Sequence, residues 1–187
     1  MKKVLMPILI VPLLLIAFGK PALGRPQSGT KFFFDGTTSQ GLEDFFIIEK
    51  NSTQGDCAGQ ALCFEPFFAT TMISCPDGTS FPFEWLFLNY FVPLDAQKHF
   101  EVSVPSDQVP FDWKGALSGK NASGTQNQGY AHYSSLGAGV EDCDMGDVSW
   151  QATGVGSAPR VPHVGRGIVA TVQKDSQGHV KITLTRA

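Results

Sequence analysis

The chain has 187 residues, of which 14 are basic and 17 acidic, for a net charge of −3 at pH 7. Without Lys2, Lys3 and Lys20, which lie in a segment that we expect to be removed, 11 basic residues face 17 acidic ones and the net charge is −6. Because an acidic surface repels phosphate groups and the sequence has no cluster of Lys or Arg, we expect no nucleic-acid partner, and an anionic membrane surface is disfavoured.

The N-terminal segment has the pattern of a cleavable secretory signal. Two lysines precede an apolar run from Val4 to Phe18, and the small residues Ala22 and Gly24 follow at the positions that signal peptidases prefer. The run is shorter than the roughly 20 residues that a membrane-spanning helix needs. We therefore expect residues 1–24 to be a signal peptide and the protein to be secreted or periplasmic. Residues 25–187 would then form a single domain without a membrane span.

The first part of the mature chain predicts several short strands. Apolar runs that end in Gly, Asp, Asn or Ser are typical of strands joined by turns. Such runs occupy residues 31–34, 45–48 and 62–74. Pro76, Asp77 and Gly78 then predict a tight turn, because proline presets φ and glycine accepts a positive φ.

The aromatic stretch from Ser80 to Leu94 is interpreted as the central strand of the core. Aromatic rings occupy alternate positions and the residues between them are also largely apolar, which is typical of a strand buried on both faces. Pro82 and Pro93 disfavour a helix here. The following run, His99 to Val104, alternates apolar and polar residues and predicts a half-buried strand.

The composition changes in the second part of the chain. The stretch from Ser118 to Gly146 is rich in Gly, Ser, Asn and Gln, which predicts a long polar loop. Two alternating runs, Gly167 to Val172 and Val180 to Leu184, predict an antiparallel hairpin at the C-terminal end. No helical periodicity is visible. The pattern therefore predicts an all-β fold, a disulfide-stabilised antiparallel β-sandwich with jelly-roll or immunoglobulin-like connections.

All four cysteines lie in the mature part of the chain. An even number of cysteines in an exported protein predicts two disulfides, for which three connectivities are possible. We favour Cys57 with Cys63 and Cys75 with Cys143. A zinc site is disfavoured because the sequence has no Cys-x-x-Cys pair and no histidine close to a cysteine.

An acidic segment, Glu141 to Asp147, resembles a cation-binding loop in its spacing of carboxylates. Asp142, Asp144 and Asp147 supply the oxygen ligands that calcium prefers, and a disulfide at Cys143 would hold the loop. The segment lacks the closing glutamate of an EF-hand loop. We therefore prefer a solvated acidic loop and keep a structural calcium as the alternative; no other cofactor is expected.

Several aromatic residues lie in polar, glycine-rich surroundings outside the central strand. Exposed rings of this kind stack on the C–H faces of sugars, while nearby amides bond to sugar hydroxyls. The alternative is that each ring packs against an edge of the core. The candidate ligand-binding residues are Trp113, Tyr130, His132, Tyr133 and Trp150.

The sequence contains no recognisable catalytic motif of the serine-hydrolase, zinc-protease or phosphate-binding kinds. His132 is the histidine best suited to act as a base or ligand. Glu84, Glu101 and Asp112 are candidates for a glycosidase carboxylate pair, which only the fold could bring together.

These observations favour an exported, non-catalytic binding domain whose partner is a glycan or another extracellular protein. One alternative is a small secreted hydrolase with a site assembled only in the fold. Another is an extracellular or envelope assembly protein, which would present an exposed edge strand or a large apolar patch.

Overall fold

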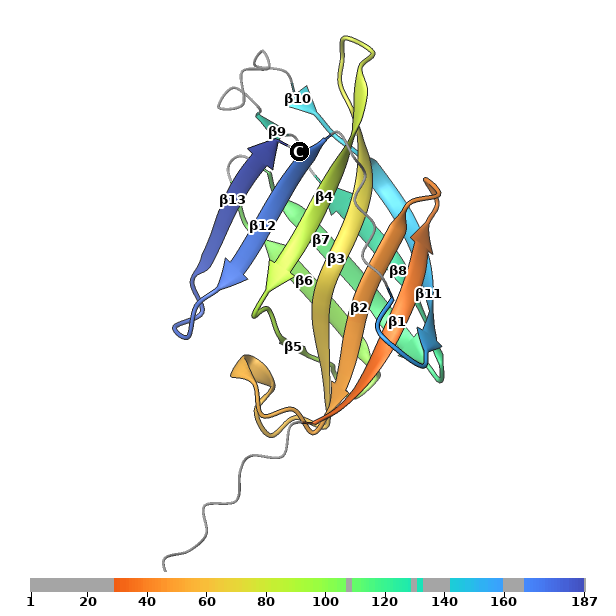
Figure 1. Ribbon diagram of the computed structural model, residues 1–187, viewed down its shortest axis with the longest axis vertical. Helices are drawn as coiled ribbons and strands as arrows, with labels where there is room; N and C mark the ends of the chain where they lie inside the picture. Colours follow the sequence, from red (N-terminus) through yellow and green to blue (C-terminus); the bar gives the residue numbers. More distant parts are fainter. Residues whose placement is uncertain (1–28, 107–108, 129–130, 133–141, 160–166, 187) are drawn as a thin grey trace, which may run out of the picture.

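The computed structural model describes residues 29–106, 109–128, 131–132, 142–159 and 167–186, and most of them lie in β-strands (Figure 1). The strands are β1 (Thr30–Thr38), β2 (Glu43–Lys50), β3 (Leu62–Ser74), β4 (Ser80–Leu88), β5 (Val92–Pro93), β6 (His99–Val104), β7 (Phe111–Ser118), β8 (Asn121–Gln128), β9 (Ala131–His132), β10 (Asp142–Cys143), β11 (Gly146–Val155), β12 (Ile168–Lys174) and β13 (Val180–Arg186). A short 3-10 helix, η1 (Gly55–Cys57), precedes β3. These residues contain no α-helix, so the predicted all-β class is confirmed for them.

One sheet of 11 strands contains every strand except β9 and β10, which pair with each other. Its order is β13-β12-β4-β3-β2-β1-β11-β8-β7-β6, with β5 paired to β3. Neighbouring strands are antiparallel except β12 and β4, which run parallel from the Ile168–Phe83 pair to the Gln173–Leu88 pair. Because the described strands form one large mixed sheet, the predicted division into the two sheets of a sandwich is not confirmed.

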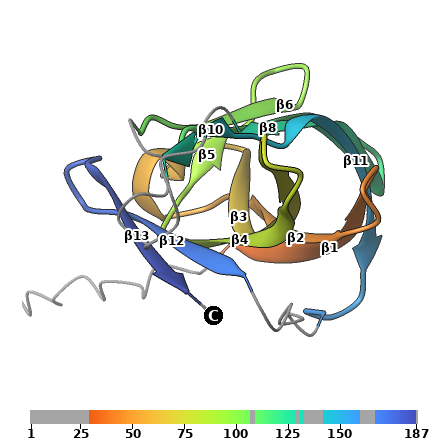
Figure 2. The same ribbon diagram turned by 90° about the horizontal axis from the view of Figure 1, so that it is seen from above.

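The large sheet curls until it is nearly barrel-shaped. Strands β1 to β4 form one wall in Figure 1 and β6 to β8 lie behind them, and Figure 2 shows these strands surrounding a common interior. The short β5 pairs with β3 and also lies against β6. The antiparallel pair β12–β13 extends the sheet beyond β4. Ile168, Ala170 and Val172 of β12 still belong to the buried core.

Aromatic side chains fill the interior of the curled sheet. The ring centroid of Phe46 lies 5.0 Å from those of Phe34 and Phe64, 5.9 Å from that of Trp113 and 5.6 Å from that of Trp150. These five rings come from β2, β1, β3, β7 and β11, and all are buried. Each buried ring contributes on the order of 2 kcal/mol by its removal from water. Their mutual contacts therefore hold strands from both walls together.

Glycines make room for these large rings on the neighbouring strands. A Cβ atom at Gly115 would lie 2.3 Å from the Trp150 ring, and one at Gly124 would lie 1.9 Å from the Lys114 carbonyl oxygen. The Trp150 Nε1–H group donates a hydrogen bond to that same carbonyl oxygen at 3.2 Å. Gly115 therefore leaves room for the Trp150 ring, and Gly124 lets β8 approach the backbone of β7 closely, because neither position carries a side chain.

The aromatic stretch from Ser80 to Leu94 forms two strands, not one. Strand β4 ends at Leu88, because Asn89 adopts a left-handed backbone conformation with φ of 56°. Trp85 is fully buried in the interior, whereas Leu88 is 39% exposed. The prediction of a core strand is correct for the first nine residues, and the reversal at Asn89 sends the remainder towards β3 as β5.

The polar stretch from Ser118 to Gly146 was predicted to be a loop, and this prediction is wrong for Asn121–Gln128, which is β8. Strand β8 lies between β7 and β11 and pairs with both over its full length. Ala122 and Gln126 are buried in the interior. Pairing on both sides satisfies the backbone hydrogen-bonding groups, and this outweighs the low intrinsic strand preference of Asn, Ser and Gly.

Both favoured disulfides are present in the structure. Cys57 is bonded to Cys63, and Cys75 is bonded to Cys143. The second bond joins residues 68 positions apart, so it links the end of β3 to β10. Two disulfides indicate an oxidising compartment, extracellular or periplasmic.

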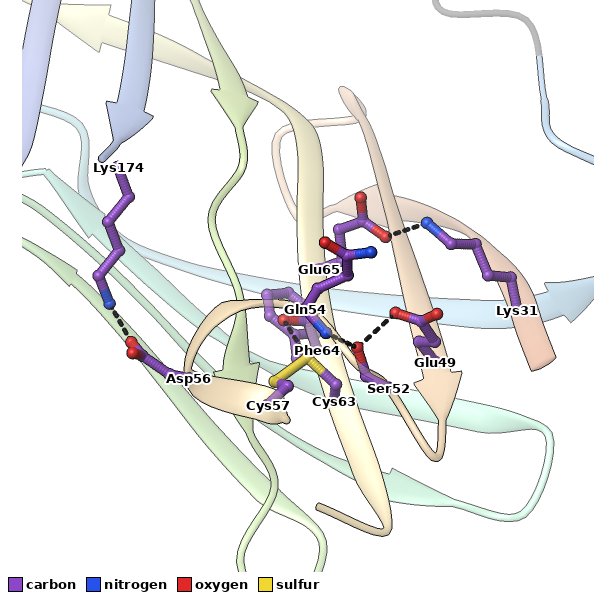
Figure 3. Close-up of a disulfide and its surroundings, with 10 residues drawn as sticks. All are labelled: Lys31, Glu49, Ser52, Gln54, Asp56, Cys57, Cys63, Phe64, Glu65 and Lys174. Carbon is purple, nitrogen blue, oxygen red and sulfur yellow. Dashed lines mark hydrogen bonds and ion pairs between the residues drawn. A yellow bond between two sulfur atoms is a disulfide. The ribbon is translucent and has the colours of Figure 1, made fainter. Parts of the chain in front are cut away.

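The segment around η1 is tied to several strands (Figure 3). Lys174, the last residue of β12, forms an ion pair with Asp56 in η1. The Lys174 ammonium also lies 5.3 Å from the centre of the Tyr90 ring. On the other side, the Ser52 hydroxyl donates a hydrogen bond of 2.7 Å to the buried carboxylate of Glu49. These contacts and the Cys57–Cys63 disulfide attach η1 to β2, β3 and β12.

We predict that Gly124→Ala lowers the free energy of unfolding by at least about 2 kcal/mol, because the new methyl group would overlap the backbone of Lys114. Gly156→Ala is the control, since a Cβ atom there meets no atom within 4 Å. Urea unfolding of both variants measures the difference. Equal midpoints for the two variants would contradict this account of how β7 and β8 pack.

Candidate functional site

Two of the candidate ligand-binding aromatics lie inside the core. Trp113 is 0% exposed and Trp150 is 3% exposed. The expectation that their rings stack on a sugar at the surface is therefore wrong for both. Strand alternation turns them towards the interior, where they pack edge-to-face with centroids 6.0 Å apart. Glycine-rich neighbours, which suggested an exposed setting, instead provide the space that the rings occupy.

The remaining candidates of that group fall largely outside the described residues. Tyr130 and Tyr133 are not among them, and of His132 the structure describes only the backbone, in β9. Their role in ligand binding stays a prediction.

The candidate calcium ligands lie at the junction of β10 and β11. The backbone of Asp144 pairs with Ser74, and the carboxylate of Asp147 accepts a hydrogen bond of 2.7 Å from Asn127. The side chain of Asp142 lies outside the described part of the structure. Within the described part, no three His, Cys, Asp or Glu residues form a group that could hold a metal ion. The calcium site therefore stays a prediction.

Of the three candidate carboxylates, Glu84 lies on one wall of the sheet, and Glu101 and Asp112 lie on the other. Glu84 on β4 is 5% exposed and lies opposite Thr70 of β3. Glu101 on β6 forms an exposed ion pair of 2.8 Å with Lys114, and Asp112 lies further along the same two strands. The hydrogen bond to Glu101 is the main reason why the pKa of Lys114 is raised. This arrangement separates Glu84 from the other two.

An apolar pocket opens at the end of the curled sheet where β1 begins and β7 turns into β8, at the bottom of Figure 1. Its volume is about 390 Å³. Its apolar lining consists of Phe32, Phe33, Phe34, Ile48, Leu62, Leu117 and Val155. Phe32 is 48% exposed although it is among the largest apolar side chains of the protein. Pockets of this size and composition are typical sites for small molecules, and they form preferentially where a curled sheet opens.

The pocket exists because the side chains of β11 become smaller towards this end. The residues that β11 turns to the interior are Val148, Trp150, Ala152 and Gly154, in that order. A Cβ atom at Gly154 would meet the Phe34 ring only at 3.8 Å, and one at Gly156 would meet no atom within 4 Å. The large rings fill the middle of the interior, while the glycines leave its lower end open.

The outer surface of β1, β8 and β11 carries two shallow polar hollows of about 580 and 540 Å³. Both are lined by Thr37, Ser123 and Gln151, which come from the three strands. Asp35, Asn121 and Thr153 continue the first hollow. These side chains offer hydroxyl, amide and carboxylate groups, without an exposed aromatic ring in the described lining.

A buried carboxyl group lies in the upper interior, opposite the apolar pocket. Asp44 on β2 is 0% exposed and accepts a hydrogen bond of 2.8 Å from the Gln126 amide on β8. Burial raises the pKa of Asp44 to about 8, against the lowering effect of hydrogen bonds from Gln126 and the backbone of Thr70. Its Oδ1 atom has no hydrogen-bond partner among the described residues. Because the group is enclosed, it affects stability and is out of reach of a substrate.

Sequence reasoning did not find the pocket or Asp44. Residues 31–34 were recognised as a strand, but nothing local indicates that Phe32 lies at an open end of the sheet. The decrease in side-chain size from Trp150 to Gly154 is a signal that becomes readable once β11 is known to face the interior at alternate positions.

No family model matches this chain, and neither a curated protein nor a solved structure is detectably similar to it. Among the described residues, none of the helical structure is long and apolar enough to cross a membrane. The function of the protein therefore has to be inferred from the pocket and surfaces described above.

We predict that Asp44→Asn reduces the pH dependence of stability. The folded-state pKa of about 8 exceeds the ordinary value of 3.8, so the folded protein binds the proton more tightly. The wild-type free energy of unfolding should then fall as the pH rises through this interval. Asparagine mimics the protonated carboxyl group and should be more stable than aspartate by a few kcal/mol above about pH 8.

Urea unfolding of both proteins at about pH 5 and about pH 8.5 checks this expectation. The lowered pKa values of Asp95 and Asp175 place their own effects at more acidic pH, outside this interval. If the free energy of unfolding changed equally with pH in the wild type and the variant, the raised pKa would not belong to Asp44.

Proposed function

We propose that this protein is a non-catalytic binding protein of an oxidising compartment, and that it holds a small, largely apolar molecule in the pocket next to Phe32. The observation that carries the proposal is an open pocket of about 390 Å³ with an apolar lining, beside a described core that is rich in aromatic rings. Exposed apolar side chains gathered around a hollow are typical of binding sites.

The proposal is supported by how the pocket is built. Each wall belongs to a strand that is held by the aromatic core or by a neighbouring strand, so the lining is largely preformed. Phe34 is stacked on Phe46 at 5.0 Å, and the Gly154 N–H group donates a hydrogen bond of 2.8 Å to the Lys120 carbonyl oxygen. A preformed apolar pocket binds its ligand with little loss of conformational entropy.

We predict that Gly156→Leu weakens binding of decanol, an uncharged apolar probe, at least tenfold, because the added side chain occupies the pocket. Thr153→Leu is the matched control, since it adds the same group to the outer surface of β11. Isothermal titration measures both affinities, and thermal unfolding checks that both variants fold. Decanol that binds neither the wild type nor the control would rule out the proposed function.

Glycan binding is the second candidate, and the polar hollows on β1, β8 and β11 favour it. Their hydroxyl and amide side chains are the groups that bond to sugar hydroxyls. Gln151 lines both hollows and is exposed, so it lies where a bound sugar would meet it. This surface replaces the buried Trp113 and Trp150 as the candidate glycan-binding face.

We predict that a glycan identified by array binding loses roughly two- to tenfold in affinity with Gln151→Ala, the effect of removing one hydrogen-bonding side chain. Gln173→Ala, which removes an exposed amide from β12, is the control and should leave the affinity unchanged. A glycan array without any binding would remove this candidate.

A further inference from the structure

One lysine lines the apolar pocket, and the backbones of two more lie next to residues of its wall. Lys120 lines it directly and is the charged residue of the lining. Lys50 lies opposite Leu62, a wall residue, in the pairing of β2 with β3. The carbonyl oxygen of Lys98 accepts a hydrogen bond of 3.0 Å from the N–H group of Leu117, another wall residue. Three different connections therefore bring positive charge to one end of an otherwise acidic protein.

These three lysines, like Lys181 on β13, form no ion pair with a carboxylate among the described residues. All three are exposed. Paired lysines elsewhere are Lys31 with Glu65, Lys114 with Glu101 and Lys174 with Asp56. Lysines without a described acidic partner beside an apolar pocket produce a positive potential at its opening, which attracts an anionic group on a ligand.

We infer that the ligand of this pocket is a single-chain amphiphile with an anionic headgroup, such as a medium-chain carboxylate. This inference rests on the proposed function. The alkyl chain packs among Phe32, Phe34 and Leu117, and the headgroup lies at the opening beside the Lys120 ammonium. Every ligand of this class has one apolar chain and one negative charge. The apolar lining matches the chain, and the three lysines match the charge.

A free amphiphile fits these observations better than an anionic bilayer does. The mature chain carries a net charge of −6, which repels an anionic membrane surface as a whole. A pocket of about 390 Å³ has room for one small molecule. The positive potential is confined to the opening, within the roughly 8 to 10 Å over which exposed charges act at moderate salt.

Three probes with the same alkyl chain test the headgroup: decanoate, decanol and decylammonium, each titrated into the purified disulfide-bonded protein below its micellar concentration. We expect decanoate to bind about two- to fivefold more tightly than decanol, and decylammonium to bind more weakly than decanol. The advantage of decanoate should decrease as salt is added.

Each outcome of this comparison is decisive. Equal affinity for all three probes would overturn the headgroup inference and leave the apolar pocket in place. Failure of all three to bind would overturn the proposed function and this inference together. Co-sedimentation with phosphatidylglycerol vesicles, in the absence of decanoate binding, would assign the lysines to a membrane surface and overturn the inference as well.

Substitution of the lysines locates the headgroup. We expect the double variant Lys50→Gln and Lys120→Gln to bind decanoate no more tightly than decanol. Lys181→Gln is the matched control, because Lys181 is exposed on β13 and has no described ion pair. Lys120→Arg should retain the preference. A double variant that still prefers decanoate would overturn the inference.

Discussion

The constraint on which this structure depends is the filling of the interior of one curled sheet. Phe46 contacts rings from five other strands, and these contacts require large side chains on some strands and very small ones on others. Gly115 and Gly124 meet this requirement in the middle of the sheet, beside Trp150. Protein interiors are close-packed. Where a small residue faces the interior and no large ring from a neighbouring strand fills the space beside it, a hollow remains.

The apolar pocket follows from this same distribution of side-chain volume. Towards the end of β11 the inward positions change from Trp150 to Ala152 and Gly154, and no ring from another strand compensates for the lost volume. Phe32 therefore remains partly exposed at the opening. A site that arises from the packing of the core is rigid, and its charge is supplied separately by lysines on the surrounding turns and strand ends.

The upper interior contains polar groups where the lower interior is open. The Gln126 amide reaches across from β8 to Asp44 on β2, and burial raises the pKa of that carboxyl group to about 8. A protonated carboxyl group bonded to an amide is compatible with an apolar core, whereas a buried carboxylate is costly. This contact joins opposite parts of the sheet at the end away from the pocket, so the polar interior and the proposed binding site are physically separate.

The sequence by itself determined the features that depend on short-range patterns: the all-β class and most of the strand positions. It limited the disulfides to three connectivities, and the structure shows the favoured one, Cys57 with Cys63 and Cys75 with Cys143. The tertiary structure alone decided which way each strand faces. Alternation along a strand is local, but the side that becomes the interior depends on the curl of the whole sheet. That curl buries Trp113 among the rings of the core. It also brings Gln126 to Asp44, 82 residues away in the chain, and leaves Phe32 at an open end.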